Sequence, residues 1–178
     1  MINVSPNINN GIIYYYEMII GGVAMVFENG MASVLIKKPH AVAEISGGKM
    51  HPEIRGEVRF FQTNLGVMVV ADVRGLPLMD TRCENPIFAM HIHSGESCEN
   101  PEKHYNPENC PHPYHSGDLP PLFSNDGYAF EATLTNRFDI AEIIEKTVVI
   151  HSKPDDFKTQ PSGDSGEIIA CGVIRELA

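Results

Sequence analysis

The chain has 178 residues, enough for one domain with a core of its own. Its formal net charge of −10 argues against nucleic acid and anionic membrane surfaces as partners, and an anionic substrate would need a local positive site. Thirteen Pro and fifteen Gly, with no Trp, favour a β-rich chain with long loops. Four Cys allow two disulfides without requiring an extracellular setting.

The N-terminal region differs in character from the rest of the chain. Residues 11–27 are apolar, but Glu17 interrupts them and the stretch is too short for a transmembrane span. No Lys or Arg precedes Lys37, so a signal peptide is poorly supported and a cytoplasmic location is favoured, while the cysteines leave an extracytoplasmic one open. The run at residues 12–20 could form a strand, or join an interface in a homodimer. We expect residues 1–40 to be an N-terminal extension and residues 41–178 to be the main domain.

From residue 41 onward, the pattern is one of strands and turns. Residues 54–61 alternate between apolar and polar, which is the period of a half-buried strand. Further strands are expected at 41–45, 66–73, 128–134, 147–151 and 168–174, and one helical turn within 139–145. Strands spaced this closely indicate antiparallel hairpins, so the expected fold is an all-β sandwich or barrel.

The segment 87–93 is expected to be a single strand that carries two histidines. Successive side chains of a strand point to opposite faces, so Phe88, Met90 and Ile92 would share one face while His91 and His93 share the other. An apolar core face would then support a pair of imidazoles two residues apart. This arrangement favours metal ligation over surface decoration.

A dense set of metal-binding residue types follows. Five of the eight histidines, two of the four cysteines and one Asp lie within residues 91–118, namely His91, His93, His104, His112, His115, Cys98, Cys110 and Asp118. So much imidazole with one carboxylate suits Zn or Cu better than Ca or Mg. Residues 94–127 read as a long, proline-rich loop, and metal binding would order it. The alternative is a polar loop that is rich in His by chance.

These residues resemble the copper/zinc superoxide dismutase family. The resemblance rests on His91-Ile-His93, Cys98, His104-Tyr-Asn-Pro, His112, His115-Ser-Gly-Asp118-Leu, Val148-Val-Ile-His151, Asp155-Asp156 and Ala170-Cys171-Gly-Val-Ile. It extends over residues 41–174. It implies a flattened Greek-key β-barrel with an immunoglobulin-like layout, in which long metal-binding loops hold Cu and Zn beside each other.

The resemblance also implies a role for each site residue. Copper would be bound by His91, His93, His104 and His151, which would be the catalytic residues, and zinc by His104, His112, His115 and Asp118. Asp155 would link a copper-binding His to a zinc-binding His, and Cys98 would pair with Cys171. Three His and one carboxylate form the closed set of a structural zinc. The implied reaction converts superoxide to oxygen and hydrogen peroxide, with His104 taking up and returning a proton.

One position departs from the family pattern. The family has an Arg beside copper, three residues before the last Cys, where this chain has Ile168. Loss of that cation should slow the encounter with superoxide, although Lys153, Lys158 or Arg137 could replace it through space. The main alternative function is therefore a Cu/Zn-binding, metal-buffering protein of low activity on the same scaffold. A zinc-stabilised interaction module is a weaker alternative.

Two cysteines, Cys83 and Cys110, lie outside the family pattern. We expect them to form a second disulfide that staples the metal loop. The alternative is a pair of buried thiols.

Overall fold

The computed structural model describes residues 16–20, 23–27, 31–78 and 86–177. The chain forms two compact units, Met1–Lys38 and Pro39–Ala178. In the first unit, β1 (Tyr16–Ile20) pairs antiparallel with β2 (Val23–Phe27), and a 3-10 helix, η1, spans Met31–Ile36. The expected division after residue 40 into an extension and a domain stays a prediction. Within the described ranges, every helix is too short or too polar to cross a membrane.

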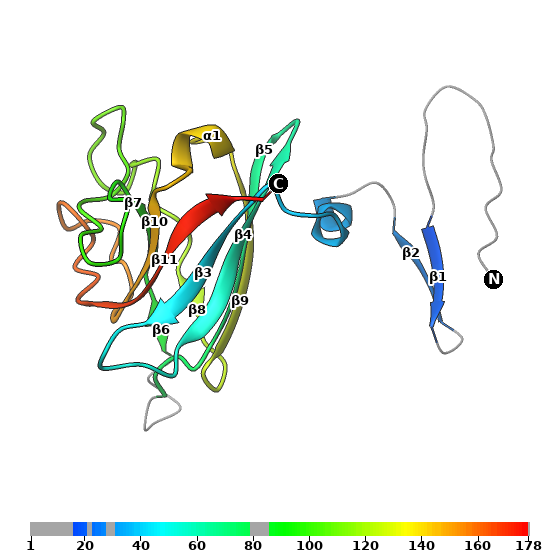
Figure 1. The fold of residues 1–178 in the computed structure, drawn as a ribbon, viewed down its shortest axis with the longest axis horizontal. Coiled ribbons are helices and arrows are strands. Elements are labelled where there is room, and N and C mark those ends of the chain that lie inside the picture. The colour runs from blue at the N-terminus through cyan, green and yellow to red at the C-terminus, as the bar shows by residue number, and fades with distance from the viewer. Residues whose placement is uncertain (1–15, 21–22, 28–30, 79–85, 178) are drawn as a thin grey trace. The chain divides into compact units, whose positions relative to one another are not determined.

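The second unit is built around one antiparallel sheet of seven strands, which curls on itself (Figure 1). The strand order is β7-β10-β11-β3-β4-β5-β9. The bounds are Ala41–Gly47 for β3, Arg55–Thr63 for β4, Gly66–Arg74 for β5, Met90–His93 for β7, Tyr128–Thr135 for β9, Thr147–His151 for β10 and Ile168–Glu176 for β11. Neighbours that are distant in the sequence, such as β5 and β9, are typical of Greek-key connections. The expected all-β fold is confirmed.

Period-2 alternation explains the core of this sheet. In β4, Val58 and Phe60 are fully buried, whereas Arg55, the first residue of the same strand, is exposed. In β10, Val148 and Ile150 belong to the same core cluster. Each of these strands thus directs one row of apolar side chains into the core enclosed by the curled sheet, and burial of these side chains stabilises the sheet.

The expectation of one continuous strand over residues 87–93 was wrong. Residues 87–88 form β6 (Ile87–Phe88) and pair with β8 (Leu122–Phe123), whereas β7 pairs with β10. The chain therefore changes its partner at Ala89. The expected faces nevertheless hold, because Phe88, Met90 and Ile92 all lie in the core cluster. The segment 94–127 is also not wholly irregular, since it contains β8. The only helix described after η1 is α1 (Ile140–Ile143).

Two long loops lie on the side of the sheet that ends with β7 and β10. Residues 94–121, drawn in green, and residues 152–167, drawn in orange, both extend beyond these strands (Figure 1). A disulfide between Cys98 and Cys171 ties the first loop to β11, with the two Cα atoms 5.8 Å apart. The expected pairing of Cys83 with Cys110 stays a prediction, because Cys83 lies outside the described residues. Cys110 is half-buried and forms no disulfide with Cys98 or Cys171.

Candidate metal centre

The first histidines of the centre project from strands. His91 and His93 lie on the face of β7 opposite the core residues Met90 and Ile92, and His151 ends the neighbouring strand β10. In the register of these strands, His91 pairs with Val149. All three histidines are buried, because the two long loops cover this outer face of the sheet. The sheet thereby fixes the backbone of three imidazoles before any loop contributes.

The loop that follows β7 returns to bond with its free edge. The Ile92 N–H donates to Gly117 O, the Tyr105 N–H donates to Ile92 O, and the Gly117 N–H donates to Tyr105 O, each at 2.8 Å. These three backbone hydrogen bonds form a closed ring and place His104 and Asp118 beside the strand. A Cβ at residue 117 would lie 2.2 Å from Ile92 O, so the close approach requires glycine.

Two groups of buried side chains converge in this region, and the nitrogen and oxygen atoms that each group offers lie within 4.8 Å of one another. The first group is His91, His93, His104 and His151; the second is His104, His112, His115 and Asp118. His104 belongs to both. In the first group, the centroids of the imidazole rings are 4.1 to 6.4 Å apart. The two groups together contain seven residues, and the fold brings these together from two strands and one loop.

Hydrogen bonds show which ring nitrogen of His93 and of His151 is available to bind a metal. The Nδ1–H of His93 donates to Glu102 O at 2.8 Å, and the Nδ1–H of His151 donates to Gly166 O at 3.3 Å. The opposite nitrogen of each ring is then an unprotonated acceptor. Five such buried ring nitrogens have no hydrogen-bond partner: Nδ1 of His91 and His112, and Nε2 of His93, His104 and His151. Buried polar atoms rarely stay unpaired, so these atoms indicate a bound cation.

Several atoms of the second group have separations close to those expected around zinc. Nδ1 of His104 lies 2.7 Å from Asp118 Oδ1 and 3.4 Å from Nδ1 of His115. Nδ1 of His112 lies 3.0 Å from Asp118 Oδ2. Zinc with ligand bonds of about 2.0–2.1 Å sets its ligand atoms about 3.3 Å apart. Three nitrogens and a carboxylate at these separations fit zinc without a change of fold.

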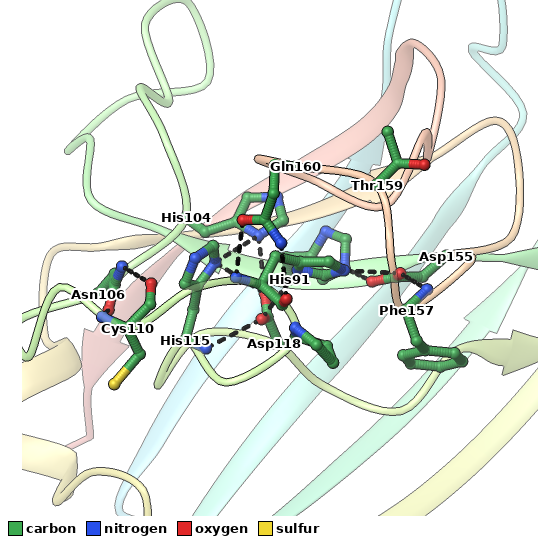
Figure 2. Close-up of polar contacts among 12 residues, drawn as sticks. His91, His104, Asn106, Cys110, His115, Asp118, Asp155, Phe157, Thr159 and Gln160 are labelled. Carbon is green, nitrogen blue, oxygen red and sulfur yellow. Dashed lines mark hydrogen bonds and ion pairs between the residues drawn. The ribbon is translucent and has the colours of Figure 1, made fainter.

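A single carboxylate joins the two groups behind the rings. Asp155 Oδ2 accepts from Nε2–H of His91 at 2.8 Å (Figure 2). Its Oδ1 accepts from Nε2–H of His112 at 2.9 Å. Asp155 therefore lies where the family resemblance leads us to expect a linking carboxylate. Its two bonds leave the Nδ1 atoms of both rings directed at the metal positions and fix the ring orientations.

Burial sets the protonation of the groups. Desolvation lowers the pKa of His93 to about 3 and that of His151 to about 4, so both rings are neutral at pH 7. Burial also opposes ionisation of Asp155, but hydrogen bonds from His91, from the Phe157 N–H and from His112 outweigh it and lower its pKa to about 2. Neutral imidazoles beside an ionised carboxylate are the protonation state that metal binding needs.

Two of the three cations considered as replacements for the family Arg have other contacts. Nη1 of Arg137 lies against the backbone carbonyls of His115 and Asp118, and Nζ of Lys153 pairs with Asp164 at 3.5 Å. Lys158 is exposed on the second loop. Ile168 begins β11, pairs with His151 in the register, and is 42% exposed. An apolar side chain thus flanks a ligand of the first group on the solvent side.

Sequence reasoning missed one residue of the site. Gln160 contacts the backbone of His112 from 48 residues away in the chain. A glutamine in an exposed, proline-rich loop carries no pattern that predicts such a contact.

Comparison with known proteins agrees with this geometry. The family model described as copper/zinc superoxide dismutase matches residues 54–174. The relative named superoxide dismutase (Cu-Zn) 2 of Aquifex aeolicus (strain VF5) is 33% identical over 143 residues, covering 69% of this chain and 80% of the relative. Superoxide dismutase (Cu-Zn) of Legionella pneumophila is 35% identical over 136 residues, covering 70% of this chain and 80% of the relative. That of Escherichia coli (strain K12) is 30% identical over 145 residues, covering 67% and 78%. The chain belongs to the copper/zinc superoxide dismutase family.

Proposed function

We propose that this chain is a superoxide dismutase with one copper and one zinc. Copper would be held by His91, His93, His104 and His151, and zinc by His104, His112, His115 and Asp118. The observation that carries the proposal is the set of five buried ring nitrogens that have no hydrogen-bond partner and belong to residues of the two groups. Four of them belong to the four proposed copper ligands, and an all-imidazole set suits copper.

The chemistry divides between the metal and the chain. Bound copper would supply the electron changes by which one superoxide is oxidised to oxygen and a second is reduced, with two protons, to hydrogen peroxide. The chain holds the ligand geometry and provides a place for a proton. Nε2 of His104 is a buried acceptor with no partner, while its Nδ1 faces Asp118, so Nε2 is the atom at which a proton could be held and returned to product.

The closed second group supports a structural role for zinc. Its three imidazoles and one carboxylate are all buried and supply four ligands, which leaves no position for substrate. The first group lies beside Ile168, which is partly exposed, so small anions would approach from that side.

Ile168 also favours a second candidate, a metal-buffering protein with little turnover. Superoxide is an anion, and the chain carries a net charge of −10. The family's cation beside copper is replaced by an apolar side chain, so neither steering nor orientation of the anion has its usual source. Binding of both metals alone therefore does not separate the enzyme from the buffer.

The deciding experiment measures superoxide removal per bound copper. The full chain is loaded with Cu and Zn, the stoichiometry is checked by elemental analysis, and the rate is followed across ionic strength. We expect turnover that depends on copper. A rate that falls with added salt would indicate that other cations guide the anion. One Cu and one Zn bound with negligible turnover would overturn the enzyme and leave the buffer.

Substitution at residue 168 tests the anion path directly. Ile168→Arg should raise superoxide removal per copper by about tenfold, because it restores a fixed cation beside the proposed copper site. Leu65→Arg is the matched control, since Leu65 is 60% exposed in the turn between β4 and β5 and the charge change is the same. An equal rise in both variants would show that only net charge matters.

A further inference from the structure

We propose that Gln160 and Arg137 are positioning residues that hold the backbone of the three zinc-only ligands in place. The inference rests on the proposed zinc assignment, because it concerns His112, His115 and Asp118. These three ligands lie on a loop segment without helix or strand. Asp118 forms an isolated β-bridge with His91, and side chains from outside the segment add further contacts to its backbone.

Gln160 grips His112 through a two-bond amide pair. Its Nε2 donates to His112 O at 2.8 Å, and its Oε1 accepts from the His112 N–H at 3.0 Å. Figure 2 shows Gln160 lying over the cluster, on the loop that also carries Asp155. Both backbone polar groups of the ligand are thus satisfied by one side chain, in the pattern that a neighbouring strand would supply. The amide fixes position as well as direction, since both bonds must form together.

His112 is also held at its other end by the same loop. Its ring donates to Asp155 at 2.9 Å, so Gln160 and Asp155 bracket the residue from backbone to imidazole. Gly163 packs against this contact, and a Cβ there would lie 2.0 Å from Asp155 Oδ1 and 2.8 Å from Nε2 of His112. The loop of residues 152–167 is therefore packed closely against His112.

Arg137 holds the remaining two ligands. Its Nη1 lies 3.3 Å from His115 O and 3.2 Å from Asp118 O, with Pro113 O at 3.5 Å. The backbone N–H of Arg137 donates to Thr135 Oγ1 at 3.2 Å, which ties the residue to the end of β9. A guanidinium directed at carbonyl oxygens is a charge-assisted donor, and such bonds are stronger than neutral ones. Arg137 thus secures the C-terminal part of the segment as Gln160 secures His112.

The test is the rate at which zinc leaves the Cu- and Zn-loaded full chain to an excess of a chelating dye. Gln160→Ala should release zinc on the order of tenfold faster, as loss of groups that orient metal ligands typically does. Gln160→Glu keeps an acceptor for the His112 N–H but loses the donor, so an intermediate rate is expected. Thr159→Ala is the matched control, because Thr159 bonds to Asp156 and Gly163 within its own loop.

Arg137→Lys separates geometry from charge. Lysine keeps the positive charge but not the planar fork, so zinc release should also accelerate if hydrogen bonding to the carbonyls matters. The visible spectrum of the protein with Co(II) in place of zinc gives a second readout, since a loosened ligand set changes its bands. Wild-type release and spectra in Gln160→Ala and Arg137→Lys would overturn the proposal. Equal acceleration in Thr159→Ala would do the same, by showing general loosening of the loop.

These measurements are independent of catalysis. Zinc release needs no superoxide, so an inactive protein that still releases zinc faster on substitution would retain the positioning role and lose only the enzyme. A protein that binds no zinc at this group would instead overturn the assignment on which both proposals rest.

Discussion

The two halves of the metal centre are built in different ways. In the proposed copper group, His91, His93 and His151 project from adjacent strands, where sheet hydrogen bonds and a packed core fix the backbone. In the proposed zinc group, every ligand comes from residues 104–118, which contain no helix or strand and pair with β7 only through isolated bridges at His104 and Asp118. The first half inherits its geometry from the fold, whereas the second depends on individual hydrogen bonds.

His104 and Asp155 connect the halves, and each does so differently. His104 offers one ring nitrogen to each group, so neither group is complete without it. Asp155 touches neither metal position but bonds to one ring of each group. A disturbance in the loop-built half can therefore reach the strand-built half through two residues. The predictions below test how far the two halves can be separated.

Zinc removal should have the largest effect, and it should fall on the loop half. Free zinc at a thousand times its dissociation constant stabilises a protein by about 4 kcal/mol, because it binds only the folded state. For a chain of this size, that corresponds to a fall in Tm of about 8–16 °C when zinc is withdrawn. Calorimetry with and without a zinc chelator measures it.

Hydrogen exchange then locates the change. Without zinc, the amides of Tyr105 and Gly117 should lose protection, while those of β4 and β5 keep it. Equal loss across the whole sheet would contradict the division into two halves.

Gly117→Ala should have the next largest effect, because it breaks the backbone hydrogen bonds that join the loop to β7. The new Cβ would meet Ile92 O at 2.2 Å and the Tyr105 N at 3.0 Å, so the backbone ring must open. We expect a loss of about 3 kcal/mol in the free energy of unfolding, the upper range for overpacking. Gly48→Ala is the control, since its Cβ would lie 3.5 Å from Ile169 O, an ordinary contact. Urea denaturation that gives the same midpoint for both variants would contradict the prediction.

The same division explains what the sequence could predict. Alternation on β7 placed His91 and His93 opposite Met90 and Ile92, because strand periodicity is a local property. The break at Ala89 escaped prediction, since it depends on β8, which lies some 30 residues away in the chain. Strand patterns alone did not assign ligands in the loop; the family resemblance did that.

Contacts between loops were the hardest to foresee. Arg137 was expected only as a replacement cation, yet its Nη1 donates to loop carbonyls. Gln160 carried no signal, because it recognises the backbone of His112 and backbone contacts leave no side-chain pattern to read. The described contacts of both residues became visible only in three dimensions.

Asp155→Asn is the smallest expected effect, and it distinguishes the halves most sharply. Asparagine offers one acceptor oxygen, so it can accept from His91 or from His112 but not from both, and its NH2 opposes the remaining ring N–H. One ring must turn or change tautomer. Loss of such a partner weakens metal binding by about 10–100-fold, or about 1.4–2.7 kcal/mol. Competition with chelators measures the affinities for copper and zinc separately.

The affinities for both metals should fall, because one ring loses its acceptor and the other keeps only a neutral amide oxygen in place of a carboxylate, whereas Gln160→Ala should change zinc binding alone. Asp156→Asn is the control, since the hydrogen bonds of that carboxylate go to Lys158 and Thr159 within its own loop. If Asp155→Asn weakened zinc but left copper unchanged, the sheet alone would be sufficient to orient His91. The proposed copper group would then not depend on Asp155. The carboxylate would be needed only to orient His112, which lies on no strand.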